Sequence, residues 1–195
     1  MRLIVLLLIL GFGGWWAMYE PETLRAPGMT VSGMPAIWPE HIPPWTKGDY
    51  SINALDAYAV RARVLSKSHY FFDRESRLAP YDLALGWQEM SDTTVIDALG
   101  ISQSDRFYFY HWNGNPPIAP NAIAYLSGNM HIVPGNDDVL ATLRRVHKGD
   151  IIRLQGHLIE IHGKDNWTWV SATNQYSAGK GGCKVIWVTS LTIDP

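Results

Sequence analysis

The chain opens with an uninterrupted apolar run. No charged residue lies between Leu3 and Tyr19, and a helix needs roughly 17–25 such residues to cross a bilayer. Trp15 and Trp16 lie towards the far end of the run, where aromatic residues gather at a membrane interface. The pattern predicts a transmembrane helix over residues 1–19.

This run has two interpretations, a cleaved signal peptide and an uncleaved signal anchor. Cleavage needs small residues in an A-x-A-like pattern, whereas Ala17 stands alone among bulky neighbours, so the anchor is favoured. Arg2 lies on the N-terminal flank, and the positive-inside rule then keeps that end in the cytoplasm. We expect a single-pass protein of the inner (cytoplasmic) membrane that contacts the bilayer through residues 3–19, with its C-terminal domain facing the periplasm.

Residues 20–44 form a proline-rich tether in this interpretation. Six prolines interrupt it, at Pro21, Pro27, Pro35, Pro39, Pro43 and Pro44. Proline removes a backbone donor and biases the preceding residue to extended geometry, which disfavours regular structure. Apolar residues such as Val31 and Ile37 suggest that the second half lies along a domain surface. We expect residues 45–195 to form a single exported globular domain.

Alternating apolar and polar positions predict several strands in this domain. They cover residues 58–65, 106–112, 149–161, 167–170 and 183–193. Two short helices are predicted from their caps. Ser91 or Asp92 begins one that ends before Gly100, and Asn136 begins another that ends by Gly149.

These elements predict an α+β fold that is mostly β. We expect a small curled sheet or OB-like barrel with two or three short helices, preceded by one N-terminal transmembrane helix. Gly156 in mid-strand indicates the bulge or bend that closes small barrels. Leu143, Leu154, Leu158 and Trp187 are expected core positions.

Composition narrows the function classes. Of the 195 residues, 47% are hydrophobic and 17% charged, which excludes disorder as the overall state. Lys and Arg number 16 against 18 Asp and Glu, so the charge gives no case for binding nucleic acid. The single cysteine excludes an intramolecular disulfide and a Cys-rich zinc module.

Neither a metal site nor a cofactor is indicated by motif. The histidines match no metal-ligand spacing, and no nucleotide loop or hydrolase elbow occurs. Cys183 lacks the local signatures of cysteine peptidases. We therefore expect a buried, inert thiol. The alternative, a nucleophilic role, would require a histidine brought near Cys183 by the fold. We assign no catalytic residue from sequence.

Two short segments are candidates for a binding surface. Trp87 offers a flat platform near Asp92, and Asn129 lies close to His131. Each has a structural alternative: Trp87 in the core of a helix–turn–helix corner with Asp92 as a cap, and a capped turn between two helices with His131 bound to backbone.

The segments 82–92 and 129–134 give the chain a family resemblance. With Asp82-Leu83-Ala84-Leu85-Gly86-Trp87, Met90-Ser91-Asp92 and Asn129-Met130-His131-Ile132-Val133-Pro134 it resembles an uncharacterised group of bacterial membrane-anchored proteins. The resemblance runs from about Trp45 to Ile193. It implies a bacterial source and carries over no activity or catalytic residue.

Two functions stay open from sequence. The first is a membrane-tethered periplasmic binding or assembly domain, with an envelope protein as a possible partner and Trp87, Asp92, Asn129 and His131 near its recognition surface. The alternative is a cell-envelope hydrolase that uses His131 or Cys183.

Overall fold

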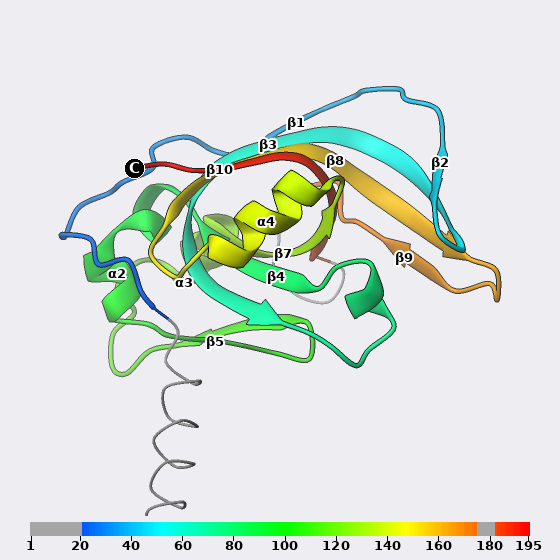
Figure 1. The fold of residues 1–195 in the computed structure, drawn as a ribbon. Coiled ribbons are helices and arrows are strands. Elements are labelled where there is room, and N and C mark those ends of the chain that lie inside the picture. Colours follow the sequence, from blue (N-terminus) through cyan, green and yellow to red (C-terminus); the bar gives the residue numbers. More distant parts are fainter. Residues whose placement is uncertain (1–20, 175–181) are drawn as a thin grey trace, which may run out of the picture.

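The computed structural model describes residues 21–174 and 182–195, and it shows a mostly-β fold with short helices (Figure 1). In chain order the strands are β1 (Ala36–Trp38), β2 (Trp45–Lys47), β3 (Tyr50–His69), β4 (Tyr81–Gly86), β5 (Gly100–Ser104), β6 (Phe107–His111), β7 (Ser127–Pro134), β8 (Ile151–Gly163), β9 (Thr168–Val170) and β10 (Lys184–Ile193). The helices are α2 (Thr93–Asp97), α3 (Pro120–Tyr125) and α4 (Asp137–Arg145), with 3-10 turns η1 (Glu75–Arg77) and η2 (Gln88–Ser91). The predicted α+β class is confirmed.

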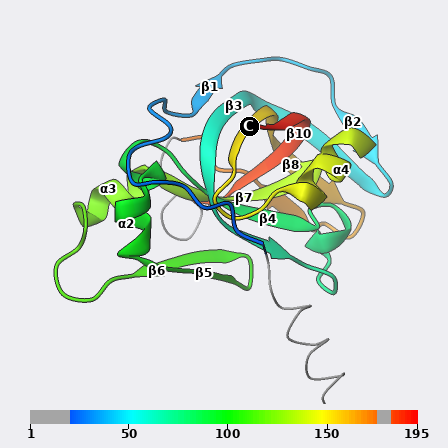
Figure 2. The same cartoon turned by 60° about the vertical axis from the view of Figure 1, so that its left-hand side comes forward.

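Five strands form a sheet that curls and closes on itself. Their order is β3–β4–β7–β10–β8, and β8 pairs again with β3. Neighbours are antiparallel except β7 and β10, which run parallel. The 20-residue β3 pairs with β8 along residues 50–63 and with β4 along residues 63–69, so it belongs to both sides of the ring. Figures 1 and 2 show it wrapping around the sheet, which confirms the predicted curl.

Bulges accompany this curvature. Register shifts fall between Ala54 and Asp56, between Val64 and Ser66, and between Val188 and Ser190. Such irregularities bend a strand and increase its twist. Gly156 was predicted to mark a bulge or bend in its own strand. The bulge lies instead in β10, the strand that pairs with Gly156. At Gly156 itself a Cβ would collide with the carbonyl oxygen of Trp187, so the glycine allows two strands to approach closely.

Both faces of the ring bury side chains. On β8, Leu154 and Leu158 belong to the main hydrophobic core, whereas Ile159 and Ile161 belong to a second cluster. This division follows the two-residue period of a strand. Helix α4 adds Leu143 to the main core.

The predicted core positions are confirmed for three leucines. Leu143, Leu154 and Leu158 are fully buried. Trp187 differs, because it is half-buried at the margin of the second cluster. It packs edge-on against Trp45, with ring centroids 5.2 Å apart.

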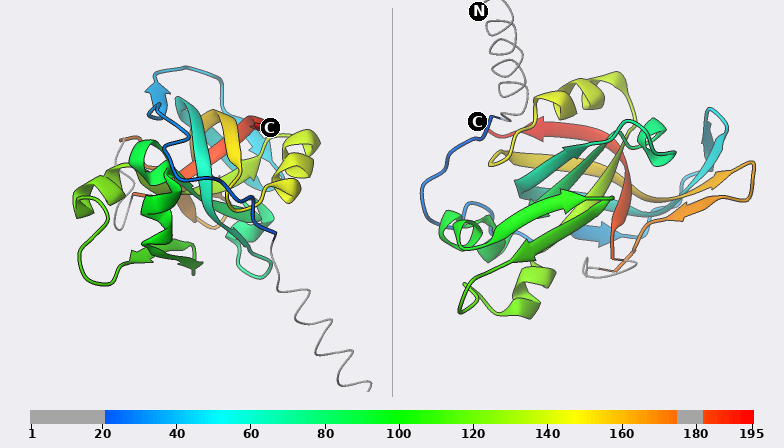
Figure 3. Two further views of the ribbon diagram at one scale, coloured as in Figure 1. Left: turned by 90° about the vertical axis from the view of Figure 1, so that its left-hand side faces the viewer. Right: turned by 90° about the horizontal axis from the view of Figure 1, so that it is seen from below.

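The segment between β4 and β7 leaves the ring. It carries η2, α2, the β5–β6 hairpin and α3. The hairpin is a two-stranded sheet of its own. Figure 3 shows it in front of the ring in the view from below, so it forms an extra layer on that side.

The predicted helix caps are confirmed at their N-termini. The Asp92 side chain accepts from the Thr94 N–H at 2.8 Å, and Asn136 Oδ1 accepts from the Val139 N–H at 2.9 Å. The C-terminal predictions were less accurate. Gly100 begins strand β5 and does not cap α2, whose C-cap is Ala98.

Two segments were assigned wrongly from sequence. Residues 83–92 are not a helix–turn–helix corner, because they begin in strand β4. Residues 127–131 are not a turn between helices, because they lie in strand β7. Every residue of β4 and β7 is buried. A strand covered on both faces loses the polar alternation that marks a half-exposed strand.

The proline-rich segment is partly structured. Ala36–Trp38 forms strand β1 and pairs with β3. Val31 is buried in the main core. The second half of the segment thus lies along the domain, as its apolar residues predicted.

Candidate functional site

The middle of β4 and β7 carries a buried carboxylate beside a buried imidazole. Asp82 and His131 are opposite each other in the register of these antiparallel strands. Oδ2 of Asp82 lies 2.9 Å from Nδ1 of His131, and their side chains are 0% and 4% exposed. Nδ1 has no hydrogen-bond partner of good alignment. The pair is therefore a close electrostatic contact, because the geometry at Nδ1 is too poor for a hydrogen bond to the carboxylate.

Two further side chains hold the Asp82 carboxylate. Nη1 of Arg106 lies 2.9 Å from Oδ1, and Nδ2 of Asn129 donates to Oδ2 at 3.3 Å. A buried carboxylate is costly unless it is paired and hydrogen-bonded. Arg106 supplies the opposite charge that this position requires.

Arg106 reaches the site from the turn of the β5–β6 hairpin. Its backbone is left-handed, with φ of +68°, which places it within a tight turn. Its Nε lies 2.7 Å from Oδ2 of Asp73, and its guanidinium stacks 3.9 Å from the ring centroid of Tyr70. Burial lowers the pKa of Arg106, but Asp73 and Asp82 outweigh it and raise that pKa. The hairpin is thus fastened to the β3–β4 loop and to the buried carboxylate at once.

Cys183 completes the group from a third strand. It directly precedes β10 and is half-buried. β10 runs parallel to β7 with Val185 opposite His131, and Cys183 lies two residues before Val185. The thiol is close enough to the imidazole to contribute to the raised pKa of His131. Carboxylate, imidazole and thiol therefore meet from β4, β7 and the start of β10.

The environment of His131 favours its charged form. Burial lowers the pKa of the imidazole, but contacts with Asp82 and Cys183 outweigh burial and raise the pKa to about 9. The ring of Trp169 packs against it, with centroids 4.9 Å apart. The raised pKa favours the imidazolium at neutral pH, and an imidazolium can donate a proton to a neighbouring group.

Two of the four predicted binding residues belong to this group. Asn129 and His131 come together as the sequence suggested, although on a strand. Trp87 is fully buried in the main core, and Asp92 caps α2. The core position of Trp87 and the capping role of Asp92 are confirmed, whereas the expected helix–turn–helix corner is a strand followed by a 3-10 turn.

Cys183 was expected to be a buried, inert thiol, and it is half-buried instead, close to His131. Its expected lack of reactivity stays a prediction. Sequence reasoning could not place it there, because it depends on the parallel pairing of β7 with β10.

Asp82 and Arg106 were missed as site residues. Asp82 is the one charged residue of the segment Tyr81–Gly86, which is otherwise apolar. A charge in a fully buried strand is a signal of pairing or function, and it could have been found. Arg106 gave no comparable signal, because a charged residue in a hairpin turn is ordinary.

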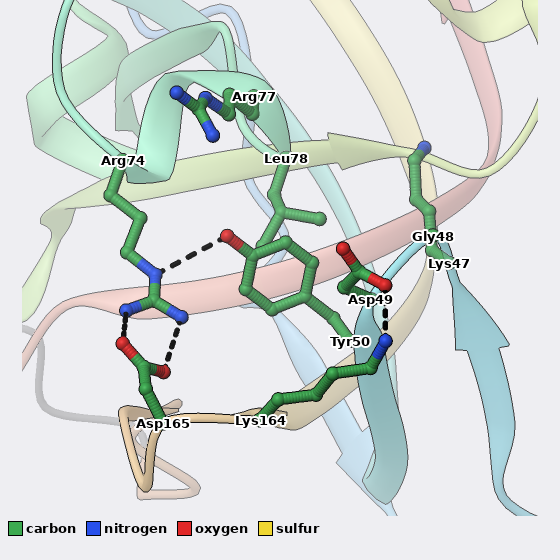
Figure 4. Close-up of a pocket in the computed structure, with 9 residues that line it drawn as sticks. All are labelled: Lys47, Gly48, Asp49, Tyr50, Arg74, Arg77, Leu78, Lys164 and Asp165. Carbon is green, nitrogen blue, oxygen red and sulfur yellow. Dashed lines mark hydrogen bonds and ion pairs between the residues drawn. The ribbon is translucent and has the colours of Figure 1, made fainter.

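A separate cavity lies where the start of β3, η1 and the β8–β9 turn meet (Figure 4). Its volume is about 710 Å³, and it is lined by Lys47, Gly48, Asp49, Tyr50, Arg74, Arg77, Leu78, Lys164 and Asp165. Figure 4 shows that its acids are paired within it: Arg74 with Asp165, and Lys164 with Asp49 at 2.6 Å. Both acids of the cavity are thus paired, while Lys47 and Arg77 add two further positive charges to its lining.

A line of aromatic rings leads from this cavity towards His131. Ring centroids are 5.8 Å apart for Tyr50 and Trp167, and 6.1 Å apart for Trp167 and Trp169. Trp169 in turn contacts His131. The rings form an apolar border of the site on the side of β9.

Residues 21–174 and 182–195 show neither a metal site nor a membrane-spanning helix. No group of three or more His, Cys, Asp or Glu side chains there is arranged to hold a metal ion. No helix there is long and apolar enough to cross a membrane. The predicted span over residues 1–19 lies outside the described residues.

Comparison of the chain with protein-family models, curated proteins and solved structures gave no match. Support for a function therefore comes from the geometry of the site.

Proposed function

We propose that the protein is a thiol-dependent hydrolase or acyltransferase with Cys183 as its nucleophile. The supporting observation is the arrangement of thiol, imidazole and carboxylate on three adjacent strands. A cysteine beside a histidine that a third group orients is the usual form of an activated nucleophile. Of the two functions that the sequence leaves open, this is the hydrolase.

The chemistry follows from these groups. The Cys183 thiolate attacks the carbonyl carbon of an ester, thioester or amide, and the C=O π electrons move to the oxygen. When they return, the bond to the leaving group breaks, and the His131 imidazolium gives that group its proton. The neutral imidazole then takes a proton from water or from an acceptor nucleophile. The activated nucleophile attacks the acyl carbon of the thioester, and the carbon–sulfur bond breaks to release the thiolate.

Asp82, Asn129 and Arg106 act through His131 in this scheme. Asp82 faces Nδ1 and favours the imidazolium, while Asn129 and Arg106 hold the carboxylate in place. We assign them as positioning residues, because their role in this scheme is to orient and charge the imidazole. The aromatic border at Trp169 supplies an apolar surface beside the imidazole.

Alkylation of the full chain by iodoacetamide tests the activated thiol directly. Cys183 is the only cysteine, so incorporation reports on it alone. We expect alkylation at pH 6.5 to slow on the order of tenfold or more in His131→Gln, because the imidazolium that stabilises the thiolate is gone. His162→Gln is the matched control, since His162 is a partly exposed histidine of β8. Equal rates in the wild type and His131→Gln would overturn the proposal.

Acylation tests the covalent step. With p-nitrophenyl acetate we expect rapid release of p-nitrophenolate and an acetyl group on the Cys183 peptide by mass spectrometry. Cys183→Ser should lose both signals with its unfolding midpoint unchanged. A wild-type chain whose Cys183 is alkylated rapidly but never acylated would show a reactive thiol without acyl transfer, which contradicts this function.

A binding or assembly domain is the second candidate, and the strand order favours it. The five strands of the closed ring lie in the order first–second–third–fifth–fourth, and α4 connects the third strand to the fourth. We infer from this order that the ring is an OB-like barrel. Such barrels bind oligomeric ligands on the face of their second and third strands. Those strands are β4 and β7 here, which carry Asp82, Asn129 and His131. This candidate predicts that His131→Gln and Cys183→Ser leave cellular function intact.

We also propose that this domain works on the outer side of the inner membrane. The support is the charge-free run Leu3–Tyr19 after Arg2. A C-terminal alkaline phosphatase fusion should be active and a C-terminal GFP fusion dark. The opposite pattern would reverse the orientation, and a mature protein lacking residues 1–19 would replace the anchor with a signal peptide.

A further inference from the structure

Four phenylalanines are exposed on the β3–β4 loop and the β5–β6 hairpin. Their exposed fractions are 65% for Phe71, 100% for Phe72, 44% for Phe107 and 49% for Phe109. Phenylalanine is normally among the most buried residues. Several exposed together indicate an interaction surface. We call these four residues the phenylalanine rim.

The two halves of the rim are fixed to each other. Arg106, next to Phe107, pairs with Asp73 of the loop, and its backbone N–H donates to the Tyr70 hydroxyl at 3.2 Å. Within the loop, the Phe71 ring lies 3.9 Å from that of His69 by centroid. The rim is therefore supported by the folded domain.

The rim lies on the side where the described chain begins. In Figures 1 and 2 the loop after β3, the β5–β6 hairpin and the dark-blue start of the chain all lie on the lower side, and β1 lies on the upper side. The apolar run Leu3–Tyr19 is separated from this start, Pro21, by one residue. The inference rests on the membrane anchor proposed above, which would hold a bilayer on the side where the described chain begins.

We infer that the phenylalanine rim docks on the surface of the lipid bilayer. Aromatic and apolar side chains enter the boundary between headgroups and acyl chains, and their buried area drives binding. A few such side chains bind weakly by themselves. When the domain is already tethered, docking becomes intramolecular and weak contacts suffice. The rim residues carry no charge, so zwitterionic lipid should support docking. This inference does not depend on the chemistry of Cys183.

Fluorescence quenching in proteoliposomes tests the inference. The full chain with Cys183→Ser and Phe72→Cys carries an NBD label at position 72, in phosphatidylcholine vesicles with nitroxide-labelled acyl chains. The matched control carries the label at Trp38→Cys on β1, which is 45% exposed and on the opposite side in Figure 1. We expect quenching by lipid on the order of twofold or more stronger at position 72.

A second label separates the possible occupants of the rim. NBD at Phe109→Cys should be quenched by lipid in the same background, and Phe71→Ser with Phe72→Ser should abolish that quenching. Equal iodide access at positions 72 and 38 would overturn the inference. Protection from iodide at position 72 without lipid quenching would also overturn it, because a second copy of the chain or another protein would then cover the rim.

Discussion

Oδ2 of Asp82 and Nδ1 of His131 lie 2.9 Å apart because the two residues are opposite each other on β4 and β7. Their separation is set by the backbone pairing of two fully buried strands. Groups held on strands keep their geometry better than groups on loops. The contact is therefore a permanent feature of the fold, and its consequences can be measured.

The first prediction concerns Asp82→Asn. Removing the carboxylate takes away a contact that raises the pKa of His131, so that pKa should fall from about 9. It also removes one of the two carboxylates that pair with Arg106 and leaves Asp73 as the other, so we expect a loss of about 1–3 kcal/mol of unfolding free energy. NMR titration of the imidazole and urea unfolding measure the two effects. Asp165→Asn, in an exposed pair with Arg74, should change neither. A His131 pKa unchanged in Asp82→Asn would contradict the assignment.

The second prediction is a pH dependence of stability. The folded-state pKa of His131, about 9, exceeds the ordinary histidine pKa of 6.5. The folded state therefore binds the proton more tightly, and this stabilisation is fully present below pH 6.5 and lost as pH rises through 9. The difference in unfolding free energy between the wild type and His131→Gln should shrink over that interval. A difference that is constant from pH 6.5 to 9 would contradict it.

The third prediction concerns Gly156→Ala. A Cβ at this position meets the Trp187 carbonyl, which is backbone and cannot move aside easily. We expect a loss of about 1–3 kcal/mol of unfolding free energy, as for other overpacked sites. Gly33→Ala is the control, since a Cβ there has nothing within 4 Å. Urea midpoints that match for the two variants would show that β8 and β10 are farther apart than described.

How well each strand could be predicted from the sequence depends on how many of its faces are buried. The strand containing Leu154 was predictable because one of its faces alternates with polar residues such as Arg153 and Gln155, which are exposed. Strands β4 and β7 were not, because both of their faces are covered. The site lies on these two strands, so His131 was found as a residue but its carboxylate partner was not. Cys183 needed the long-range pairing of β10 with β7, which no local pattern encodes.

The last prediction concerns Lys184, whose side chain is fully buried. Its Nζ donates to the carbonyl oxygen of Asn174 at 2.7 Å, and it stands opposite Met130 of the main core. Burial lowers the pKa of Lys184 to about 8, although Cys183 opposes the change. The folded state therefore disfavours the ammonium, and this cost is present below pH 8.

Lys184→Met removes that cost while keeping an unbranched side chain. We expect the variant to exceed the wild type in unfolding free energy at pH 7, as when buried charges are replaced by apolar groups. The folded pKa lies below the ordinary lysine pKa of 10.5, so the wild type gains stability as pH rises from about 8 to 10.5. The advantage of the variant should shrink over the same interval. A variant less stable than the wild type at pH 7 would show that the bond to Asn174 outweighs the cost of burying the amine.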